Sequence, residues 1–367
     1  MSARLVILTH EYPPFRGGVG IYCHELAQAL LSIGVDTAVM GPRGAEGVRV
    51  WPLSCGRTLS PIDLWEMSGD LWKQRERLRG GVLLLGSYGS HLAVLILTLM
   101  GRRLPCRIWS LLHGSEVLRF SSSPVRRYFA STLLNQVEMF FVNSCFTGDL
   151  LKKTSLAGRK PIILAPCAPS HCAIERAAAS KKPSWERFRI LTLARIHPRK
   201  GQLDTARALG LLPPALKSSL HFVIGGRGDD AYLSAVVREC TRGMISWEYI
   251  GPVENESLAS TYASCDCFLM TSRSLAGSVE GFGISYLEAA WHGKPSIAFA
   301  TGGVAEAVRH GETGFVLPEG DVQGVAEAVG RLMNEPDLRE RMGSAAAGHA
   351  REFTWEKTAR VVAKQIG

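Results

Sequence analysis

Short apolar runs of strand length alternate with amphipathic helical patterns along this chain, and the series occurs twice. The first run covers residues 4–9, a Gly-rich loop follows, and a helical pattern spans residues 19–33. Further strand-like runs of the first series are residues 37–40, 82–85, 108–112, 139–142 and 162–164, with a helical pattern over 124–137. Apolar strands that alternate with helices predict a parallel sheet covered by helices on both faces.

A second series begins after residues 177–183, which are rich in Ala, Ser and Lys and which we interpret as a linker. Its strand-like runs are residues 189–193, 220–224, 246–250, 268–271 and 296–299, and helical patterns over 322–333 and 355–366 close the chain. A chain of 367 residues is long enough for two domains. We therefore expect an N-terminal domain over 1–183 and a C-terminal domain over 184–352, with a cleft between them. The last helix, about 353–367, is expected to pack back on the N-terminal domain.

Composition excludes several classes of protein. With 46% hydrophobic and 20% charged residues the chain is globular and not disordered. No apolar run is long enough for a membrane span, and the N-terminus lacks a secretion signal. The nine cysteines are scattered without a C-x-x-C pair, so we expect neither a zinc site nor a disulfide framework. These features indicate a cytoplasmic protein.

The excess of positive charge lies entirely in the first half of the chain. Residues 1–185 carry 22 Lys and Arg against 12 Asp and Glu, whereas residues 186–367 carry 20 against 21. This asymmetry indicates that the first half meets an anionic partner.

Ligands of open parallel sheets bind beyond the carboxyl ends of the strands. Gly17 and Gly18 follow the first predicted strand and open a helix, where backbone N–H groups can face an anion, although such a loop can equally be a tight turn. Arg195 and Lys200 follow the first strand of the second series and suit a diphosphate, the alternative being a solvated basic loop. His113 follows another predicted strand, where a histidine is often only a loop residue.

The segment from Glu280 to Glu288 has the most specific pattern. Two glycines, Gly281 and Gly283, precede a helix expected from Gly283 to about His292. Glu288 falls on the apolar stripe of that helix and must find a partner, since an unpaired buried carboxylate is costly. Ligand hydroxyls are one such partner, and a salt bridge or cap is the other.

With these motifs the chain resembles the retaining glycosyltransferases of family 4, which have GT-B architecture. The resemblance rests on the E-x7-E spacing of Glu280 and Glu288, on the pair Arg195 and Lys200, and on the segment 301–306. Gly17-Gly18 and the segment 113–116 fit the same family. The resemblance implies an α/β fold of two Rossmann-like β/α/β domains that face each other across a cleft.

The resemblance also implies roles for the residues. Arg195 and Lys200 would neutralise the donor diphosphate, and Glu288 would bind the nucleotide ribose. The donor sugar would contact Glu280 and His113. The remaining donor-binding residues would be Gly17, Gly18, Gly281, Phe282, Gly283 and Ile284, the last two through backbone N–H groups. These residues would catalyse hexose transfer with retention, from a nucleotide-diphosphate sugar to a glycan or lipid-linked acceptor on the first-half loops, in cell-surface polysaccharide or glycolipid synthesis.

One loop departs from the pattern of the family, and one missing motif concerns the need for a metal ion. The loop 225–228 carries an arginine where the family usually has acidic residues, which affects the expected contacts with the nucleotide base. No D-x-D sequence occurs, so we expect no metal and no other cofactor, with cations and helix dipoles in the metal's place.

A basic, aromatic segment indicates a further partner. Residues 63–79 are helical in pattern and carry two tryptophans and four cations, and pairs of arginines stand at 102–103 and 126–127. Such a surface can bind anionic lipid at the inner face of the cell membrane, or it can be a solvated face with its tryptophans in the core. We expect no nucleic-acid partner.

Three other functions remain open. A nucleotide-sugar epimerase of the same architecture would change the donor without any acceptor. A dinucleotide-binding oxidoreductase requires G-x-G-x-x-G directly after the first strand, a pattern that the loop 10–20 lacks. A non-catalytic binding protein would not need the full set of polar cleft residues.

Overall fold

The computed structural model describes residues 4–13, 17–42, 48–54, 59–174 and 187–366. The chain forms two compact units. The first consists of residues 1–167 and 354–367, and the second of residues 168–353.

The first unit contains a seven-stranded parallel sheet in the order β3-β2-β1-β4-β5-β6-β7. Its strands are β1 (Leu5–Leu8), β2 (Thr37–Gly41), β3 (Val50–Pro52), β4 (Val82–Leu85), β5 (Arg107–Leu112), β6 (Val137–Val142) and β7 (Ile162–Leu164). The chain runs outward from β1 to β3 and then returns to β4 on the other side of β1. The neighbouring ends of β1 and β4 are therefore the switch point of a Rossmann-like sheet, where ligands bind in this class of fold.

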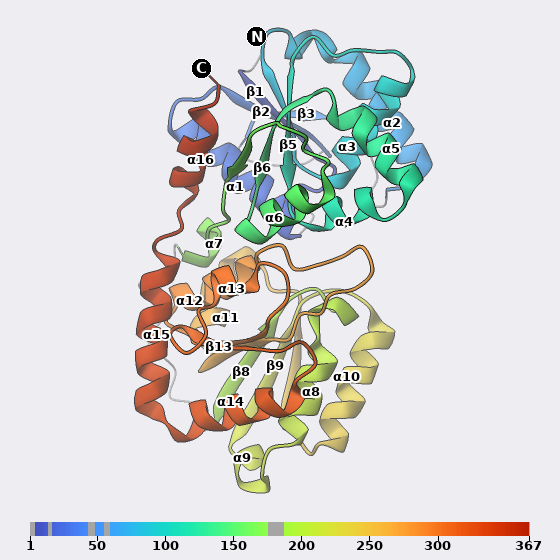
Figure 1. The fold of residues 1–367 in the computed structure, drawn as a ribbon. Coiled ribbons are helices and arrows are strands. Elements are labelled where there is room, and N and C mark those ends of the chain that lie inside the picture. Colours follow the sequence, from blue (N-terminus) through green and yellow to red (C-terminus); the bar gives the residue numbers. More distant parts are fainter. Residues whose placement is uncertain (1–3, 14–16, 43–47, 55–58, 175–186, 367) are drawn as a thin grey trace. The chain divides into compact units, whose positions relative to one another are not determined.

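Helices cover both faces of this sheet (Figure 1). Helix α1 (Gly18–Ser32) packs against the C-terminal helix α16 (Trp355–Ala363), where the rings of Tyr22 and Trp355 meet edge to face at 5.0 Å. Thr358 of α16 also donates a hydrogen bond to Pro166 O over 2.8 Å. The other helices are α2 (Pro61–Lys73), α3 (Tyr88–Leu99), α4 (Ser115–Ser121), α5 (Pro124–Leu134) and α6 (Cys145–Thr154), with a 3-10 turn at Arg75–Leu78.

The second unit repeats this plan with six parallel strands in the order β10-β9-β8-β11-β12-β13. Its strands are β8 (Phe188–Leu193), β9 (Leu220–Gly225), β10 (Trp247–Gly251), β11 (Cys267–Met270), β12 (Ser296–Phe299) and β13 (Gly314–Leu317). The order reverses between β8 and β11, which places the second switch point at the ends of these two strands.

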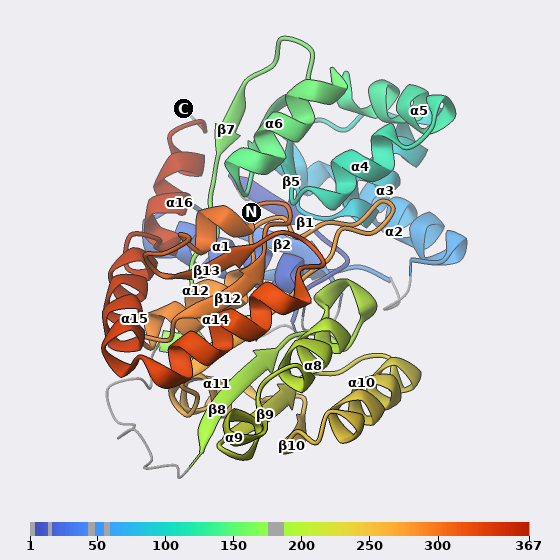
Figure 2. The same ribbon diagram turned by 60° about the horizontal axis from the view of Figure 1, so that its bottom comes forward.

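The helices of the second unit form two groups (Figure 2). Helix α8 (Gln202–Gly210) packs against α10 (Asp230–Arg242) and α14 (Val322–Asn334). On the other side α12 (Ile284–Trp291) packs against α15 (Pro336–Ala350), and α7 (His171–Ile174) packs against α11 (Asn255–Ala263). The short helices α9 (Pro214–Ser218) and α13 (Val304–Ala307) complete the unit.

Each unit has its own apolar core. In the first, strand residues such as Leu83 and Leu85 pack with Leu97 of α3 and Leu133 of α5. In the second, strand residues such as Ile190, Phe222 and Leu269 pack with apolar residues of α8 and α14. The central strands of both sheets are buried on two faces, as expected for parallel sheets between helix layers. Within the described ranges, no helix reaches the length and apolarity needed to cross a bilayer.

The compact units divide the chain earlier than the expected boundary at 183/184. Residues 168–174 belong to the second unit because Ser170 bonds to Glu288 and because His292 bonds to Ala173 O, at 2.6 and 2.8 Å. The expected linker, 177–183, lies outside the described residues. Helix α16 belongs to the first unit, the unit on which the C-terminal helix was expected to pack.

Candidate functional site

Three donors converge on the Glu280 carboxylate in the second unit. Lys200 Nζ lies 2.5 Å and Arg199 Nη1 lies 3.0 Å from Glu280 Oε2. The Ser272 hydroxyl donates to the same oxygen over 3.2 Å. The side chains of Glu280 and Lys200 are only 10% and 14% exposed, so water screens their attraction weakly. The loops that follow β8 and β11 thus bring a dense group of charges to the second switch point.

Main-chain contacts hold the basic loop against the end of β11. Gly201 follows the 3-10 turn Pro198–Lys200 with φ of +73°. A Cβ on Gly201 would lie 1.8 Å from Thr271 O, so only glycine allows this approach. Thr271 Oγ1 donates to Gly201 O over 2.7 Å, and Arg273 N–H donates to Arg199 O over 2.7 Å. The cations are therefore positioned by the backbone.

The segment after β12 supports the backbone of Glu280. Gly303 N–H donates to Glu280 O over 3.0 Å, and Thr301 Oγ1 donates to Ser272 O over 3.0 Å. A Cβ on Gly302 would lie 1.9 Å from Glu280 O. The Thr301-Gly302-Gly303 motif thus fixes the main chain that carries the central carboxylate.

Charge and burial shift the pKa values of Glu280 and Lys200 in opposite directions. Burial raises the pKa of Glu280, but Lys200 and Arg199 outweigh it and lower that pKa to about 2. Burial lowers the pKa of Lys200, while Glu280 acts to raise it. Glu280 is therefore ionised at neutral pH. One carboxylate shared by two cationic side chains leaves an excess of positive charge that an anionic ligand can neutralise.

Arg195, expected to neutralise the donor diphosphate together with Lys200, lies outside the ion pairs of Glu280. Its side chain is exposed, and its carbonyl accepts a hydrogen bond from Gln202 Nε2 over 2.9 Å. Its charge still acts to lower the pKa of Lys200. Arg199, and not Arg195, shares the Glu280 carboxylate with Lys200.

Glu288 lies on α12, is 4% exposed, and both of its carboxylate oxygens have protein partners. Tyr262 donates to Oε2 over 2.7 Å, and the Ser170 hydroxyl donates to Oε1 over 2.6 Å. Burial raises the pKa of Tyr262, and the Glu288 charge raises it further, so the phenol remains a donor. The inward-facing carboxylate that the helical pattern predicts is present, and a tyrosine and a serine satisfy it.

The loop before α12 is buried as well. Gly281 and Phe282 are shielded from solvent, and Gly283 caps the helix with φ of +96°, so that Ile284 is its first residue. The Phe282 ring packs edge to face against Phe353, with 5.5 Å between ring centroids. The helix N-terminus directs backbone N–H groups toward the loop that carries Glu280, an arrangement that favours an anion.

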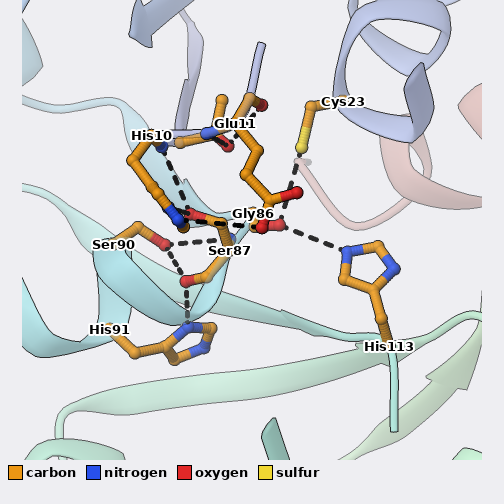
Figure 3. Close-up of polar contacts among 9 residues, drawn as sticks. His10, Glu11, Cys23, Gly86, Ser87, Ser90, His91 and His113 are labelled. Atoms are coloured by element: carbon orange, nitrogen blue, oxygen red, sulfur yellow. Dashed lines mark hydrogen bonds and ion pairs between the residues drawn. The ribbon is translucent and has the colours of Figure 1, made fainter. Parts of the chain in front are cut away.

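His113 lies at the carboxyl end of β5 in the first unit (Figure 3). Its Nε2 is 3.2 Å from Gly86 O, and because a carbonyl only accepts, Nε2 carries the proton and Nδ1 is left as an acceptor. Its backbone N–H donates to Glu116 Oε2 over 2.9 Å, and its ring meets that of Tyr22 edge to face. Burial lowers the pKa of His113, which favours the neutral imidazole.

Gly17 and Gly18 begin α1 in the same unit. Gly17 is the N-cap with φ of −164°, which is extended backbone, and Gly18 is the first helical residue. A Cβ on Gly18 would meet no atom within 4 Å among the described residues. Packing within the described chain therefore does not demand glycine at position 18.

The predicted site residues fall into two groups. His113, Gly17 and Gly18 belong to the first unit. The second unit contains Arg195, Lys200, Glu280, Gly281, Phe282, Gly283, Ile284 and Glu288. Of these, the structure joins Lys200 directly to Glu280, and Gly281 to Ile284 connect Glu280 to the helix that carries Glu288.

Four side chains that are not among the predicted site residues complete the group. Arg199 adjoins Lys200, and Ser272 follows a predicted strand, so both had a signal in the sequence. Tyr262 and Ser170 are 26 and 118 positions from Glu288, and no local pattern marks them. In the parts of the chain with described positions, no three His, Cys, Asp or Glu side chains are grouped so that they could hold a metal ion.

Known proteins resemble this chain in sequence and in fold. The model of the glycosyl transferases group 1 matches residues 174–349. A GDP-mannose-dependent alpha-(1-6)-phosphatidylinositol monomannoside mannosyltransferase of Mycobacterium tuberculosis is 26% identical over 94% of this chain and 92% of its own length.

Solved structures with 17–19% sequence identity share the fold. A sucrose-phosphate synthase of Thermosynechococcus elongatus covers 98% of this chain and 97% of its own, with a TM-score of 0.78 and 19% identity. The Anabaena protein Alr3699/HepE, crystallised with UDP and glucose, covers 99% of both chains with a TM-score of 0.76 and 17% identity. The expected GT-B fold of two Rossmann-like domains is confirmed. Residues 174–349 match the glycosyl transferases group 1, and the protein is a glycosyltransferase enzyme.

Proposed function

We propose that the protein is a retaining glycosyltransferase of family 4 that needs no metal ion and moves a hexose from a nucleotide-diphosphate sugar to a glycan or lipid-linked acceptor. The observation that carries this proposal is that Lys200 and Arg199 both form ion pairs with Glu280, beside the N-terminus of α12. Two cations and oriented N–H groups are the elements that stabilise a departing diphosphate. The comparison with a GDP-mannose-dependent mannosyltransferase supports the same reaction class.

In the proposed reaction the bond between the sugar's anomeric carbon and the diphosphate oxygen breaks while the acceptor oxygen bonds to that carbon on the same face. The proton of the acceptor hydroxyl passes to the leaving diphosphate. Lys200 and Arg199 stabilise the charge that builds on the diphosphate, and Glu280 accepts hydrogen bonds from donor-sugar hydroxyls. Glu288 binds the nucleotide ribose in exchange for one of its present donors, Ser170 or Tyr262.

The acceptor is proposed to bind to the first unit, at the strand ends that carry His113. A phosphatidylinositol mannoside is the acceptor named for the mycobacterial relative, and a glycolipid of this chemistry suits a chain with a basic first half. The product would enter cell-surface glycolipid or polysaccharide synthesis.

An anionic membrane surface is the partner proposed for the outer helices of the first unit, with the enzyme peripheral on the cytoplasmic face. Helix α5 carries no acidic residue, and its Val125 and Tyr128 are 65% and 69% exposed beside Arg126 and Arg127. On α2, Trp65 is 62% exposed, so it does not lie in the core. Exposed aromatic groups with arginines are the side chains that bind anionic lipid headgroups.

The transfer proposal is tested with GDP-mannose and UDP-glucose, each with and without phosphatidylinositol monomannoside in vesicles. Thermal melting identifies the donor, because a ligand that binds only the folded state raises the melting temperature. NMR of the product then gives the anomeric configuration, and EDTA is added in parallel. Retention of configuration with full activity in EDTA supports the proposal. Inversion, or loss of turnover with EDTA, contradicts it, and a new nucleotide sugar formed without acceptor identifies an epimerase.

The membrane proposal is tested by sedimentation with vesicles of phosphatidylcholine alone and of phosphatidylcholine mixed with the anionic lipid phosphatidylglycerol. Arg126→Gln together with Arg127→Gln is expected to weaken binding, and added salt is expected to weaken binding of the unaltered protein. Arg238→Gln with Arg242→Gln on α10 is the matched control. Equal sedimentation of all three proteins at low salt contradicts the proposal.

A further inference from the structure

Each of the two sheets has polar residues at its switch point, where the strand order reverses. In the second unit, the loop after β8 meets the residues after β11 and forms the Lys200–Glu280 cluster. In the first unit, the residue pair at the equivalent place is His10 after β1 and Ser87 after β4. Ligands of Rossmann-like sheets bind at such reversals of strand order. The first switch point is therefore a candidate ligand site as well.

His10 is held firmly at this point (Figure 3). Its Nδ1 lies 2.8 Å from Ser87 Oγ, and its backbone N–H donates to the same oxygen over 3.3 Å. The side chain is 7% exposed. A Cβ on Gly89 would lie 2.7 Å from His10 Nδ1, so the first turn of α3 makes room for the ring by having glycine there. Two hydrogen bonds and close packing fix the position of the imidazole.

One tautomer of His10 satisfies these hydrogen bonds as follows. Ser87 Oγ accepts the backbone N–H of His10 and can donate its own proton to Nδ1. A neutral ring that accepts at Nδ1 carries its proton on Nε2. Burial lowers the pKa of His10 to about 4, although Glu116 acts to raise it. The ring is thus neutral near pH 7 and offers one N–H donor.

That nitrogen lies near the Glu11 carboxylate without a hydrogen bond to it. His10 Nε2 and Glu11 Oε1 are 3.7 Å apart, which is beyond the length of a hydrogen bond. A hydroxyl oxygen beside the pair can accept from Nε2–H and donate its own proton to the carboxylate. His113 differs, because its Nε2–H is already donated to Gly86 O. The ends of β1 and β5, on either side of β4, thus present a donor on His10 and an acceptor, Nδ1, on His113.

We infer that His10 and Glu11 bind a ring hydroxyl of the acceptor, a polyol such as a sugar or an inositol, with Ser87 as the residue that positions the imidazole. This inference rests on the proposed function, in which the acceptor binds to the first unit. The carboxylate selects a group that can donate, and the imidazole selects one that can accept, so the pair recognises a hydroxyl and rejects an ether or a methyl group.

The test separates acceptor binding from donor chemistry. His10→Phe removes the donor, His10→Gln returns an N–H near the Nε2 position, and Ser87→Ala leaves the ring but removes its fixed tautomer. His24→Gln is the matched control, since His24 is a half-buried histidine of the same unit that bonds to Tyr12 and Gln28. Folding is checked by circular dichroism and melting.

Transfer is measured with GDP-mannose or UDP-glucose as donor, whichever raises the melting temperature. The acceptor is D-inositol 3-phosphate in one arm and phosphatidylinositol monomannoside vesicles in the other, which separates an inositol ring from a mannoside. His10→Phe is expected to lower kcat/KM for the acceptor by about tenfold or more, the effect of one lost hydrogen bond in a buried site. His10→Gln should recover part of the loss, and Ser87→Ala should give a smaller loss. Donor binding and donor hydrolysis without acceptor should stay within about twofold.

Two results overturn the inference. One is a folded His10→Phe protein whose acceptor kinetics match those of His24→Gln. The other is a loss of donor binding equal to the loss of transfer, which would make His10 a structural residue. If the unaltered protein binds and hydrolyses no nucleotide sugar, the proposed function fails instead. The His10 site is then tested alone by the imidazole N–H signal in NMR, which must shift when either acceptor is added.

Discussion

Lys200 Nζ and Glu280 Oε2 lie 2.5 Å apart although 80 positions separate these residues in the sequence. The pair exists because Gly201 lets the loop after β8 approach the end of β11, and because the segment 301–303 supports the Glu280 backbone. A phosphate that binds to Lys200 must share it with Glu280. The ion pair is therefore a stabilising contact of the second unit and a competitor for the donor.

Lys200→Ala is expected to reduce transfer by at least about a hundredfold, because one of the two charges on the leaving diphosphate is lost. Glu280 keeps Arg199 as a partner, so the protein should remain folded, with a free energy of unfolding lower by about 3 kcal/mol. Initial rates and melting curves measure the two effects. Arg242→Ala, at a side chain that is 76% exposed, is the control. Near-normal turnover in the folded Lys200→Ala protein would remove Lys200 from the reaction.

Gly201→Ala is expected to displace the basic loop. The residue has φ of +73°, and its new Cβ would lie 1.8 Å from Thr271 O, so the cost should be about 2 kcal/mol or more. Donor affinity should fall together with stability. Gly210→Ala on α8 is the matched control, since its Cβ would only reach ordinary contact at 3.5 Å from Gly243. Calorimetry with GDP or UDP measures the affinity of both variants, and melting curves measure their stability. Equal affinity and equal stability of the two variants would show that the loop tolerates a side chain at position 201.

Tyr262→Phe is expected to lower the free energy of unfolding by about 2 kcal/mol, because the phenol donates to a buried, charged acceptor, Glu288 Oε2. Tyr249→Phe provides the comparison, since Tyr249 is exposed and donates to a neutral acceptor, Gly226 O, over 2.7 Å. Urea unfolding followed by fluorescence measures both. A cost for Tyr262→Phe no larger than that for Tyr249→Phe would mean that the hydrogen bond to Glu288 adds little.

Stability is expected to fall as the pH drops from about 6.5 to about 4. Burial lowers the pKa of both His10 and His91 to about 4, so each ring stays neutral in the folded state while the unfolded chain takes up a proton below 6.5. Because the unfolded state binds more protons in this window, the free energy of unfolding rises with pH and levels off above 6.5. Melting temperatures from pH 4 to 8 test this, and His10→Gln should flatten part of the slope. A slope unchanged by the substitution would contradict the assigned shift.

Much of the fold follows from local pattern. The strand at residues 82–85 is predicted to the residue, and the helix expected from Gly283 begins one residue later, with Gly283 as its cap. The edge strands β3 and β13 are missed because they are three or four residues long and lack a strong apolar run. Helix α15 is missed because its sequence is rich in Ala, Gly and charged residues, so its apolar face is weak. The helix expected to reach residue 137 ends at Leu134, since Val137 opens β6.

The residues of the candidate site also differ in whether the sequence predicts them. Glu280, Lys200 and Glu288 are recognised because their spacing along the chain is itself the signal. Their partners Tyr262 and Ser170 are not, because only the folded chain brings them to Glu288. His10 and Ser87 are a further case, since strand order, and not sequence distance, makes β1 and β4 neighbours. The membrane surface and the metal-independent mechanism stay predictions for the experiments above.

The return of α16 to the first unit makes the second unit an insertion, with its chain beginning at residue 168 and ending at residue 353. A polypeptide that stops at residue 167 would lose the helix whose Trp355 covers Tyr22 and would expose the apolar face of α1. Expression of the first unit alone therefore requires residues 354–366 to be rejoined to it through a short artificial loop, whereas residues 168–353 are continuous and can be produced as a single fragment.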